Sequence, residues 1–277
     1  MARATVRIER PDDPRVEDYR DIRERDLVGR RGLFVAEGAV VLAAALDGGR
    51  HRLRSVLASE ARAAGDEGLL ARVPDDVPVY VAGAAVMNAV AGFDLHRGLV
   101  AIGERAPDPG ADALLAGLGP RGLALVALGI ANHDNMGGLF RAAAAFGVGA
   151  VILDRGSCDP LYRKAIRVSV GHALRVPFAT VADEEAALDA LERAGTRALA
   201  LTPGGALAVE DARPTGPTAL VVGAEGPGLR PGVLDRVETL RIDMPGRIDS
   251  LNVATAAAIA LHRLSSQAAW RLASAPK

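Results

Sequence analysis

The C-terminal part of the chain reads TALVVGAEGPGLRPGVLDRVETLRIDMPGRIDSLNVATAAAIALHRL from Thr218 to Leu264, and this stretch decides the fold. The apolar segments 219–222 and 240–242 predict two short strands, each followed by a loop that contains glycine. Beyond the second loop, apolar residues recur at helical spacing: Leu251, Ala254, Ala258, Leu261 and Leu264. Asp249 or Ser250 stands where the N-cap of this helix is expected. Glycine loops at strand ends are where an open α/β sheet binds its ligand, so we expect a ligand site here.

Two other interpretations compete for the glycine loops. Each loop alone is compatible with an ordinary tight turn, since strand–glycine–helix transitions are common in α/β proteins. A dinucleotide site is the second alternative, but its fingerprint is G-x-G-x-x-G after a first strand, whereas Gly223, Gly226 and Gly228 read G-x-x-G-x-G near the end of the chain. The second alternative therefore fits badly.

Length and composition indicate which class of protein this chain belongs to. The chain has 277 residues, 49% hydrophobic and 24% charged, which indicates one large or two small globular domains. Cys158 is the single cysteine, so neither a disulfide framework nor a thiolate zinc site is expected. There is no apolar run long enough to span a bilayer, and the first residues lack the apolar core of a signal peptide. We therefore expect a soluble cytoplasmic protein without a metal.

The net charge of −1 does not by itself indicate a nucleic-acid partner. Basic residues nevertheless gather locally, at Arg50, Arg52 and Arg54 and in a segment with one acid, Asp159. That segment contains Arg155, Arg163, Lys164, Arg167 and Arg175. Such clusters can neutralise phosphates, although a solvated helix face explains each of them equally well.

The pattern of elements predicts two α/β domains. Residues 1–105 contain short strands and helices after a charged segment, 13–27, that we expect to form a solvated helix. Residues 106–119 are rich in Pro, Gly and Asp and are predicted to be a linker. From 120 to 277, strands and helices alternate regularly, which predicts a mostly parallel sheet covered on both faces.

The first strand of the second domain is followed by NHDNMGGLFRAAAAFG, residues 132–147. Here Asn132 and Asn135 fall in the first turn of a predicted helix, and Arg141 lies further along it. Taken singly, the asparagines are explained as helix caps and Arg141 as a solvated side chain.

Together with the two glycine loops, this segment resembles the SpoU family, also called TrmH, of RNA 2′-O-ribose methyltransferases in the SPOUT superfamily. Its first motif, N-x-x-N-x-G-x-x-x-R-x-A-x-x-F-G, is similar to 132–147. The second, G-x-E-x-x-G-L, is similar to 223–229, and the third, I-x-M-x-G-x-x-x-S-L-N-V, to 242–253. His133 and Asp243 stand where many members have proline, which affects the loop conformations but no matched reactive side chain.

The resemblance implies an enzyme that uses S-adenosylmethionine to methylate a ribose in rRNA or tRNA. It implies a reaction site made by five residues: Asn132, Arg141, Glu225, Ser250 and Asn252. It implies a cofactor pocket with five more: Thr202, Gly223, Ile242, Met244 and Leu251. It further implies a homodimer whose site is completed across the interface, a deep trefoil knot, and a front domain similar to ribosomal L30e-like folds that binds the RNA. The front half is alternatively an unrelated α/β appendage.

The expected chemistry attacks with a ribose 2′-hydroxyl, which DNA lacks. Arg141 is expected to anchor a phosphate, because a guanidinium with a pKa above about 12 is a poor base. Deprotonation of the hydroxyl is then assisted by a phosphate or water, and the sequence does not identify the general base. Two alternatives stand beside this function: an inactive RNA-binding protein that retains the fold, and an enzyme that methylates a base nitrogen. Local basicity slightly favours rRNA over tRNA.

Overall fold

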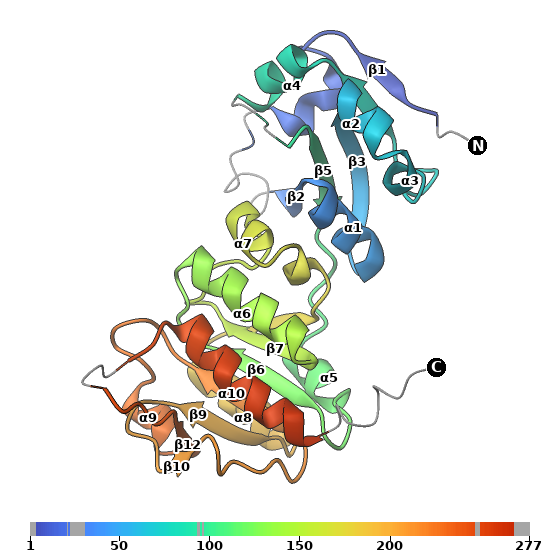
Figure 1. The fold of residues 1–277 in the computed structure, drawn as a ribbon. Coiled ribbons are helices and arrows are strands. Elements are labelled where there is room, and N and C mark those ends of the chain that lie inside the picture. Colours follow the sequence, from blue (N-terminus) through green and yellow to red (C-terminus); the bar gives the residue numbers. More distant parts are fainter. Residues whose placement is uncertain are drawn as a thin grey trace. The chain divides into compact units, whose positions relative to one another are not determined.

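The computed structural model describes residues 4–20, 22, 31–92, 95, 97–246 and 250–268. The chain forms two compact units (Figure 1). Unit 1 comprises Met1–Pro107 and Leu161–Arg175, and unit 2 comprises Asp108–Pro160 and Val176–Lys277. Both are α/β units, as the sequence predicts. In the part of the chain that is described, no helix is long and apolar enough to cross a bilayer.

Unit 1 is built on a mixed five-stranded sheet in the order β1-β4-β3-β5-β2. The β1–β4 and β4–β3 pairs are parallel, and the β3–β5 and β5–β2 pairs are antiparallel. The strands are β1 (Val6–Ile8), β2 (Leu33–Glu37), β3 (Arg52–Ser59), β4 (Val79–Ala82) and β5 (Leu99–Glu104). The helices are η1 (Pro14–Tyr19), α1 (Ala39–Gly48), α2 (Glu60–Gly65), α3 (Glu67–Leu70), α4 (Ala84–Ala91), α7 (Arg163–Val168) and η3 (His172–Leu174).

The segment predicted as a solvated helix, 13–27, is different in the structure. Its described part forms the short 3₁₀-helix η1, and its apolar residues Val16 and Tyr19 are fully buried. The Tyr19 hydroxyl lies 2.7 Å from Ser55 Oγ, so the ring carries its polar end into the core with a partner. The solvated interpretation was therefore wrong for residues 13–20, because an incomplete stripe of apolar residues was enough to anchor them in the core. Residues 21 and 23–27 lie outside the described residues.

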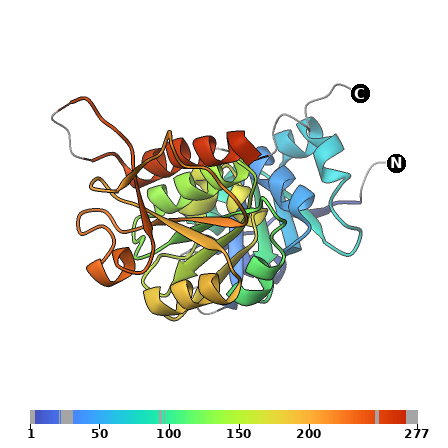
Figure 2. The ribbon, with the colours of Figure 1, turned by 90° about the horizontal axis from the view of Figure 1, so that it is seen from below.

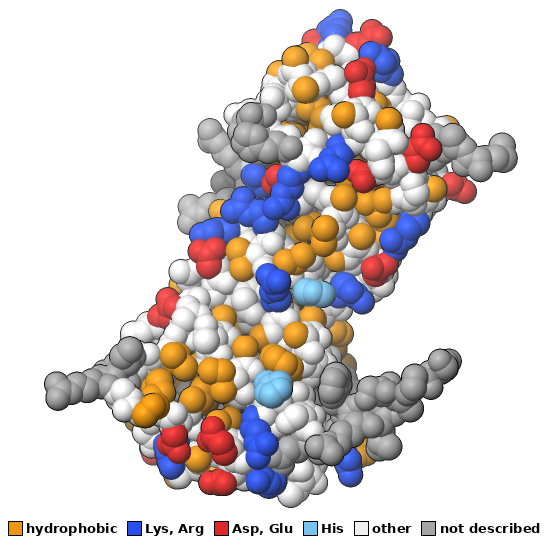
Figure 3. Space-filling model, in the orientation of Figure 1, with side chains coloured by type: hydrophobic (Ala, Val, Ile, Leu, Met, Phe, Trp, Pro, Cys, Tyr) orange, Lys and Arg blue, Asp and Glu red, His pale blue; other side chains and the backbone are white. Residues whose placement is uncertain are grey.

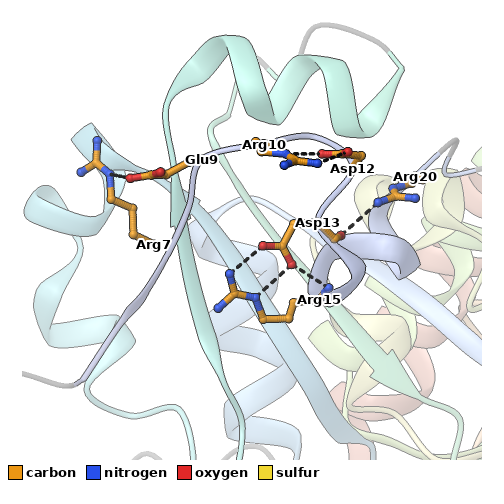
Figure 4. Close-up of polar contacts among 7 residues, drawn as sticks. All are labelled: Arg7, Glu9, Arg10, Asp12, Asp13, Arg15 and Arg20. Atoms are coloured by element: carbon orange, nitrogen blue, oxygen red, sulfur yellow. Dashed lines mark hydrogen bonds and ion pairs between the residues drawn. The ribbon is translucent and has the colours of Figure 1, made fainter.

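Neighbouring arginines and acids pair along the beginning of unit 1, as Figure 4 shows for residues 7–20. Arg15 donates to both carboxylate oxygens of Asp13, at 2.9 and 2.6 Å, and the Arg15 backbone N–H donates to the same carboxylate. These bonds lower the pKa of Asp13 to about 2. The pairs are exposed and add little stability.

Residues 161–175 belong to unit 1 by their contacts, although the sequence groups them with 120–277. Helix α7 packs beside β2, and the Arg163 guanidinium pairs with Glu37 at 3.0 Å. Gly171 has φ +83°, and a Cβ there would lie 2.6 Å from Ala44 Cβ, so only glycine permits this approach to α1. Figure 3 shows Lys and Arg side chains gathered on unit 1 where α7 lies, and α7 contains Arg163, Lys164 and Arg167.

We expect His51 to make the stability of the protein dependent on pH. Its ring is 7% exposed, packs edge-on against Phe34, and accepts the Ala106 N–H at Nδ1 (3.0 Å). Burial, reinforced by Arg50 and Arg105, lowers the pKa of His51 from 6.5 to about 4. Because the unfolded chain binds the proton more readily, this part of the stability is complete above pH 6.5 and is lost as the pH falls to about 4.

The free energy of unfolding is expected to fall by at most about 3 kcal/mol over this interval. Denaturant unfolding at a series of pH values measures the loss. His51→Gln retains an acceptor for Ala106 but does not titrate, so the His51 component should vanish from its profile. Identical profiles for wild type and variant would show that His51 has no such effect.

Unit 2 contains a seven-stranded sheet in the order β10-β12-β9-β11-β6-β7-β8, with every neighbouring pair parallel. The strands are β6 (Leu123–Ala127), β7 (Val148–Asp154), β8 (Phe178–Val181), β9 (Arg197–Leu201), β10 (Leu207–Ala208), β11 (Thr218–Val222) and β12 (Glu238–Arg241). The helices are α5 (Ala111–Ala116), α6 (His133–Ala145), α8 (Glu184–Arg193), α9 (Pro231–Leu234) and α10 (Val253–Ala268). Figure 2 shows α6 and α10 on one face of the sheet and α5 and α8 on the other.

This coverage explains the composition of the central strands. Every residue of β6 and β11 is buried, as parallel strands between two helical layers require. The predicted linker, 106–119, contributes to the same layers, because helix α5 lies within it and buries Leu115. Asp112 on α5 pairs with Arg193 on α8 at 2.8 Å. Residues 111–116 are thus part of the packed unit.

Candidate active site

The candidate site lies at the carboxyl edge of the parallel sheet of unit 2. Strands β12, β9, β11 and β6 are consecutive neighbours, so the loops that follow them emerge side by side. These loops contain Thr202 after β9, Gly223 after β11 and Ile242 after β12, and the loop after β6 leads to Asn132 at the start of α6. Residues that are distant in sequence are brought together at this edge, which is the usual ligand position in an open α/β sheet.

The loop after β11 folds back on itself. Ala224 pairs with Gly228, whose N–H donates to the Ala224 carbonyl at 3.1 Å. Gly226 and Gly228 have φ values of +86° and +68°, in the region that glycine tolerates best. A Cβ on Gly223 would lie 2.6 Å from the Gly228 carbonyl carbon, a distance that side chains do not permit. The glycines are therefore required by the shape of the loop.

Gly223→Ala is expected to displace this loop and to weaken binding of the cofactor that the resemblance implies, S-adenosylmethionine, at least tenfold. The added methyl would collide with backbone that cannot rotate away. Isothermal titration of cofactor into the variant measures the effect. Gly216→Ala is the matched control, since a Cβ at Gly216 meets nothing within 4 Å. Cofactor affinity in Gly223→Ala equal to that of the control would contradict the steric argument.

A cavity of about 430 Å³ opens between these loops, within the usual size of a small-molecule site. Its lining includes all five residues predicted to bind the cofactor: Thr202, Gly223, Ile242, Met244 and Leu251. Three of the five predicted reaction-site residues also line it: Glu225, Ser250 and Asn252. The apolar side chains suit a flat heteroaromatic base, and the carboxylate of Glu225 suits a positively charged sulfonium. The residues present therefore fit S-adenosylmethionine.

Asn252 ties three parts of the site together. Its Nδ2 donates to Asn135 Oδ1 at 2.8 Å and to Glu225 Oε1 at 3.2 Å. Its Oδ1 accepts the N–H groups of Ala254 and Thr255, at 3.0 and 3.2 Å. Asn252 is thus the N-cap of α10, where the sequence predicted Ser250 or Asp249; Asp249 is outside the described residues. Because both amide hydrogens are used, Asn252 orients its neighbours.

Close helix packing makes this cluster possible. A Cβ on Gly138 of α6 would lie 2.7 Å from Ala254 Cβ on α10, so the two helices approach as closely as glycine allows. The approach places Asn135, in the first turn of α6, against Asn252, directly before α10. Asn135 is 5% exposed, and its side-chain oxygen accepts a hydrogen bond from Asn252. Without this bond, its buried amide would lose hydrogen bonding to water without compensation, which destabilises the fold.

Two predicted reaction-site residues lie apart from the cavity lining. Asn132 is the N-cap of α6 and accepts the Asp134 N–H at 2.8 Å. Arg141 lies on α6, is exposed, and forms no hydrogen bond or ion pair with the residues that the structure describes. Asn135 was not among the predicted site residues, although the second asparagine of the first motif was a signal for it.

Neither a reactive cysteine nor a metal site is found among the described residues. Burial raises the pKa of the Cys158 thiol to about 11, so at neutral pH it is protonated and a poor nucleophile. Among the described residues, no group of three or more His, Cys, Asp or Glu side chains is placed to hold a metal ion.

Comparison with known proteins identifies the family of this chain. Residues 122–262 match the SpoU rRNA Methylase family. An uncharacterized tRNA/rRNA methyltransferase of Mycobacterium tuberculosis is 42% identical over 271 residues, covering 91% of this chain and 88% of the relative. A 23S rRNA (guanosine-2′-O-)-methyltransferase from a Burkholderia species is 33% identical over 196 residues, covering 70% of this chain and 79% of the relative.

Solved structures match over both units. A crystal structure of an RNA 2′-O ribose methyltransferase is 28% identical, with a TM-score of 0.75, and covers 95% of this chain and 99% of its own. An AdoMet-bound rRNA methyltransferase from Sinorhizobium meliloti, 23% identical, shares the fold with a TM-score of 0.80 over 95% of this chain and 98% of its own. This chain belongs to the SpoU rRNA methylase family, and the predicted resemblance is confirmed.

Proposed function

We propose that this protein transfers a methyl group from S-adenosylmethionine to a ribose 2′-hydroxyl of RNA, a tRNA or an rRNA. The observation that carries the proposal is the cavity at the carboxyl edge of the sheet, whose wall contains the bonded Asn252 and Glu225. Family membership and the 2′-O-methyltransferase activities named for its relatives support the same reaction. The 23S rRNA activity named for one relative favours rRNA over tRNA, and such a substrate places the reaction in the cytoplasm.

Thr202, Gly223, Ile242, Met244 and Leu251 are the residues that would hold the cofactor, since all line the cavity. When bound, S-adenosylmethionine supplies a methyl group already activated by its sulfonium sulfur. What remains for the protein is to hold the ribose oxygen in line and to let its proton leave. Positioning alone accounts for about 7 to 11 kcal/mol of barrier reduction in well-oriented reactions.

The side chains of the site divide this work. Asn252 fixes the Glu225 carboxylate by its 3.2 Å bond, and Asn135 fixes Asn252 from the other side. Ser250 offers an exposed hydroxyl at the cavity. Arg141 is available to grip an RNA phosphate, because its guanidinium has no acid partner among the described residues. It does not serve as the base, and the hydroxyl proton leaves with the help of an RNA phosphate or water. Asn132 supports the loop as a cap.

We further propose that the enzyme is a homodimer. Two large apolar side chains near α10 are each 39% exposed: Ile259 on the helix, and Leu251 two residues before the helix begins. Arg141 is separate from the cavity lining of its own chain, which is the arrangement expected where a second copy completes the site. Family membership also supports the trefoil knot in unit 2, and the L30e-like unit 1 as the part that selects RNA.

Transfer of labelled methyl from S-adenosylmethionine to unmodified total RNA tests the function, with nucleoside mass spectrometry as the readout. A 2′-O-methylnucleoside is the expected product, and a DNA of the same sequence should accept no methyl because it lacks the hydroxyl. A base-methylated nucleoside would establish the alternative of base methylation. Cofactor and RNA binding without any transfer would favour the inactive RNA-binding protein.

A further inference from the structure

A second feature of the carboxyl edge is the turn that follows β7. Strand β7 lies next to β6 in the parallel sheet, so its end emerges beside the loop that leads to Asn132. The turn, Asp154 to Ser157, is closed by the Ser157 N–H, which donates to the Asp154 carbonyl at 3.2 Å. Arg155 occupies its second position and is exposed.

Side-chain bonds hold this turn against the neighbouring loop. Asp154, which is 8% exposed, accepts at Oδ1 the Gly129 N–H (2.8 Å) and the Ser157 hydroxyl (2.6 Å). Ser157 Oγ accepts the Ile130 N–H at 3.0 Å, and the Cys158 N–H donates to the Ile130 carbonyl at 2.8 Å. These bonds fix the backbone on both sides of Arg155 to residues 129–130, just before Asn132.

Arg155 lacks the acid partner that several other arginines of unit 2 have. Arg193 pairs with Asp112, Arg236 with three carboxylates on α8, and Arg241 with Asp243. Arg155 forms no hydrogen bond or ion pair with the described residues. Its neighbour Asp154 is buried, and Asp154 Oδ1 accepts from Gly129 and Ser157 rather than from Arg155.

We propose that Arg155 binds a phosphate of the RNA substrate beside the methyl-transfer site. The inference rests on the proposed function, since it identifies where that substrate is gripped. A guanidinium fork matches a phosphate in geometry and charge. A turn that is already fixed loses little conformational freedom when the phosphate binds, which is what a specific contact requires.

Filter binding of a labelled 23S rRNA transcript across a salt series tests the proposal. Arg155→Ala is expected to raise the Kd for RNA about tenfold, the effect of losing one charge-assisted hydrogen bond. The slope of log K against log salt should fall by about 1. The Kd for S-adenosylmethionine should stay unchanged. Arg230→Ala is the matched control, because Arg230 is exposed in the same unit and lies 3.5 Å from a carboxylate of Glu184.

A second variant tests the fixed turn. Ser157→Ala keeps the charge of Arg155 but removes the bonds to Asp154 and Ile130, so RNA affinity should fall about threefold. Thermal unfolding of the whole chain checks that the variant is folded at the temperature of the binding assay. An Arg155→Ala protein that binds RNA as the control does, with the same salt slope, would overturn the proposal. Binding is measured without methyl transfer, so failure of the proposed activity would be seen separately, in the nucleoside assay.

Discussion

Asn252→Ala is expected to lower kcat/KM for methyl transfer about a hundredfold, which corresponds to about 2.7 kcal/mol of transition-state stabilisation. The change removes both donors that orient Asn135 and Glu225 and both acceptor bonds at the start of α10. It should also lower stability, by about 1 kcal/mol for the cap and about 1–3 kcal/mol for the unpaired buried Asn135. Steady-state kinetics and thermal unfolding measure the two effects.

Asn252→Asp separates orientation from stability. An aspartate retains the oxygen that caps α10, but it cannot donate to Asn135 and it places a second carboxylate 3.2 Å from Glu225. We expect this variant to keep the cap component of stability and to lose activity as Asn252→Ala does. Near-normal kcat/KM in Asn252→Asp would show that the donors of Asn252 are unimportant.

Arg141→Ala is expected to lower kcat at least about a hundredfold, while the Kd for S-adenosylmethionine stays within about twofold of wild type. The Kd should be unchanged because Arg141 lies outside the cavity lining and has no bond that holds the described part of the fold. Arg141→Lys should be intermediate, since it keeps the charge but loses the planar fork. Arg193→Ala, on α8, controls for the loss of a surface charge. A kcat unchanged in Arg141→Ala would remove this residue from the reaction.

The two inactive variants also test the proposed dimer. If Arg141 of one copy serves the cavity of the other, a refolded mixture of Arg141→Ala and Asn252→Ala contains hybrid dimers with one intact site each. Random pairing then restores about a quarter of wild-type activity. If both residues act within one chain, each hybrid has no intact site, and the mixture stays as inactive as its components.

Much of this architecture can be predicted from the sequence, because it depends on patterns of residues that are close together along the chain. The apolar strands 123–127 and 218–222 are short, almost wholly hydrophobic and separated by helical patterns, which is the signature of a doubly covered parallel sheet. The glycines at 223, 226 and 228 mark a loop whose backbone demands them. These features depend on residues near one another in sequence, and they predicted the position of the cavity.

The errors at Asn135 and in 106–119 concern partners that are distant in sequence, whereas the error at the N-cap of α10 is local. Asn132 and Asn135 both start α6, and only the approach of α10 at Gly138 makes the second one a buried partner of Asn252. The N-cap of α10 was placed at Ser250 or Asp249 because the first apolar residue of the stripe, Leu251, was taken into the helix, which begins at Val253. Residues 106–119 were predicted to be a linker from their content of Pro, Gly and Asp, whereas burial of Leu115 is a tertiary effect.

Residues 161–175 pack with unit 1, and this limits which fragments of the protein can fold by themselves. A fragment that starts at Asp108 retains the whole region matched to the family, yet it separates α7 from β2 and η3 from α1. Leu161, Ile166 and Leu174, all buried in the intact chain, would then face water. Such a fragment should aggregate, and the complementary fragment 1–107 would lack one wall of its core. For protein engineering, the two units are therefore not interchangeable modules that a single cut can separate.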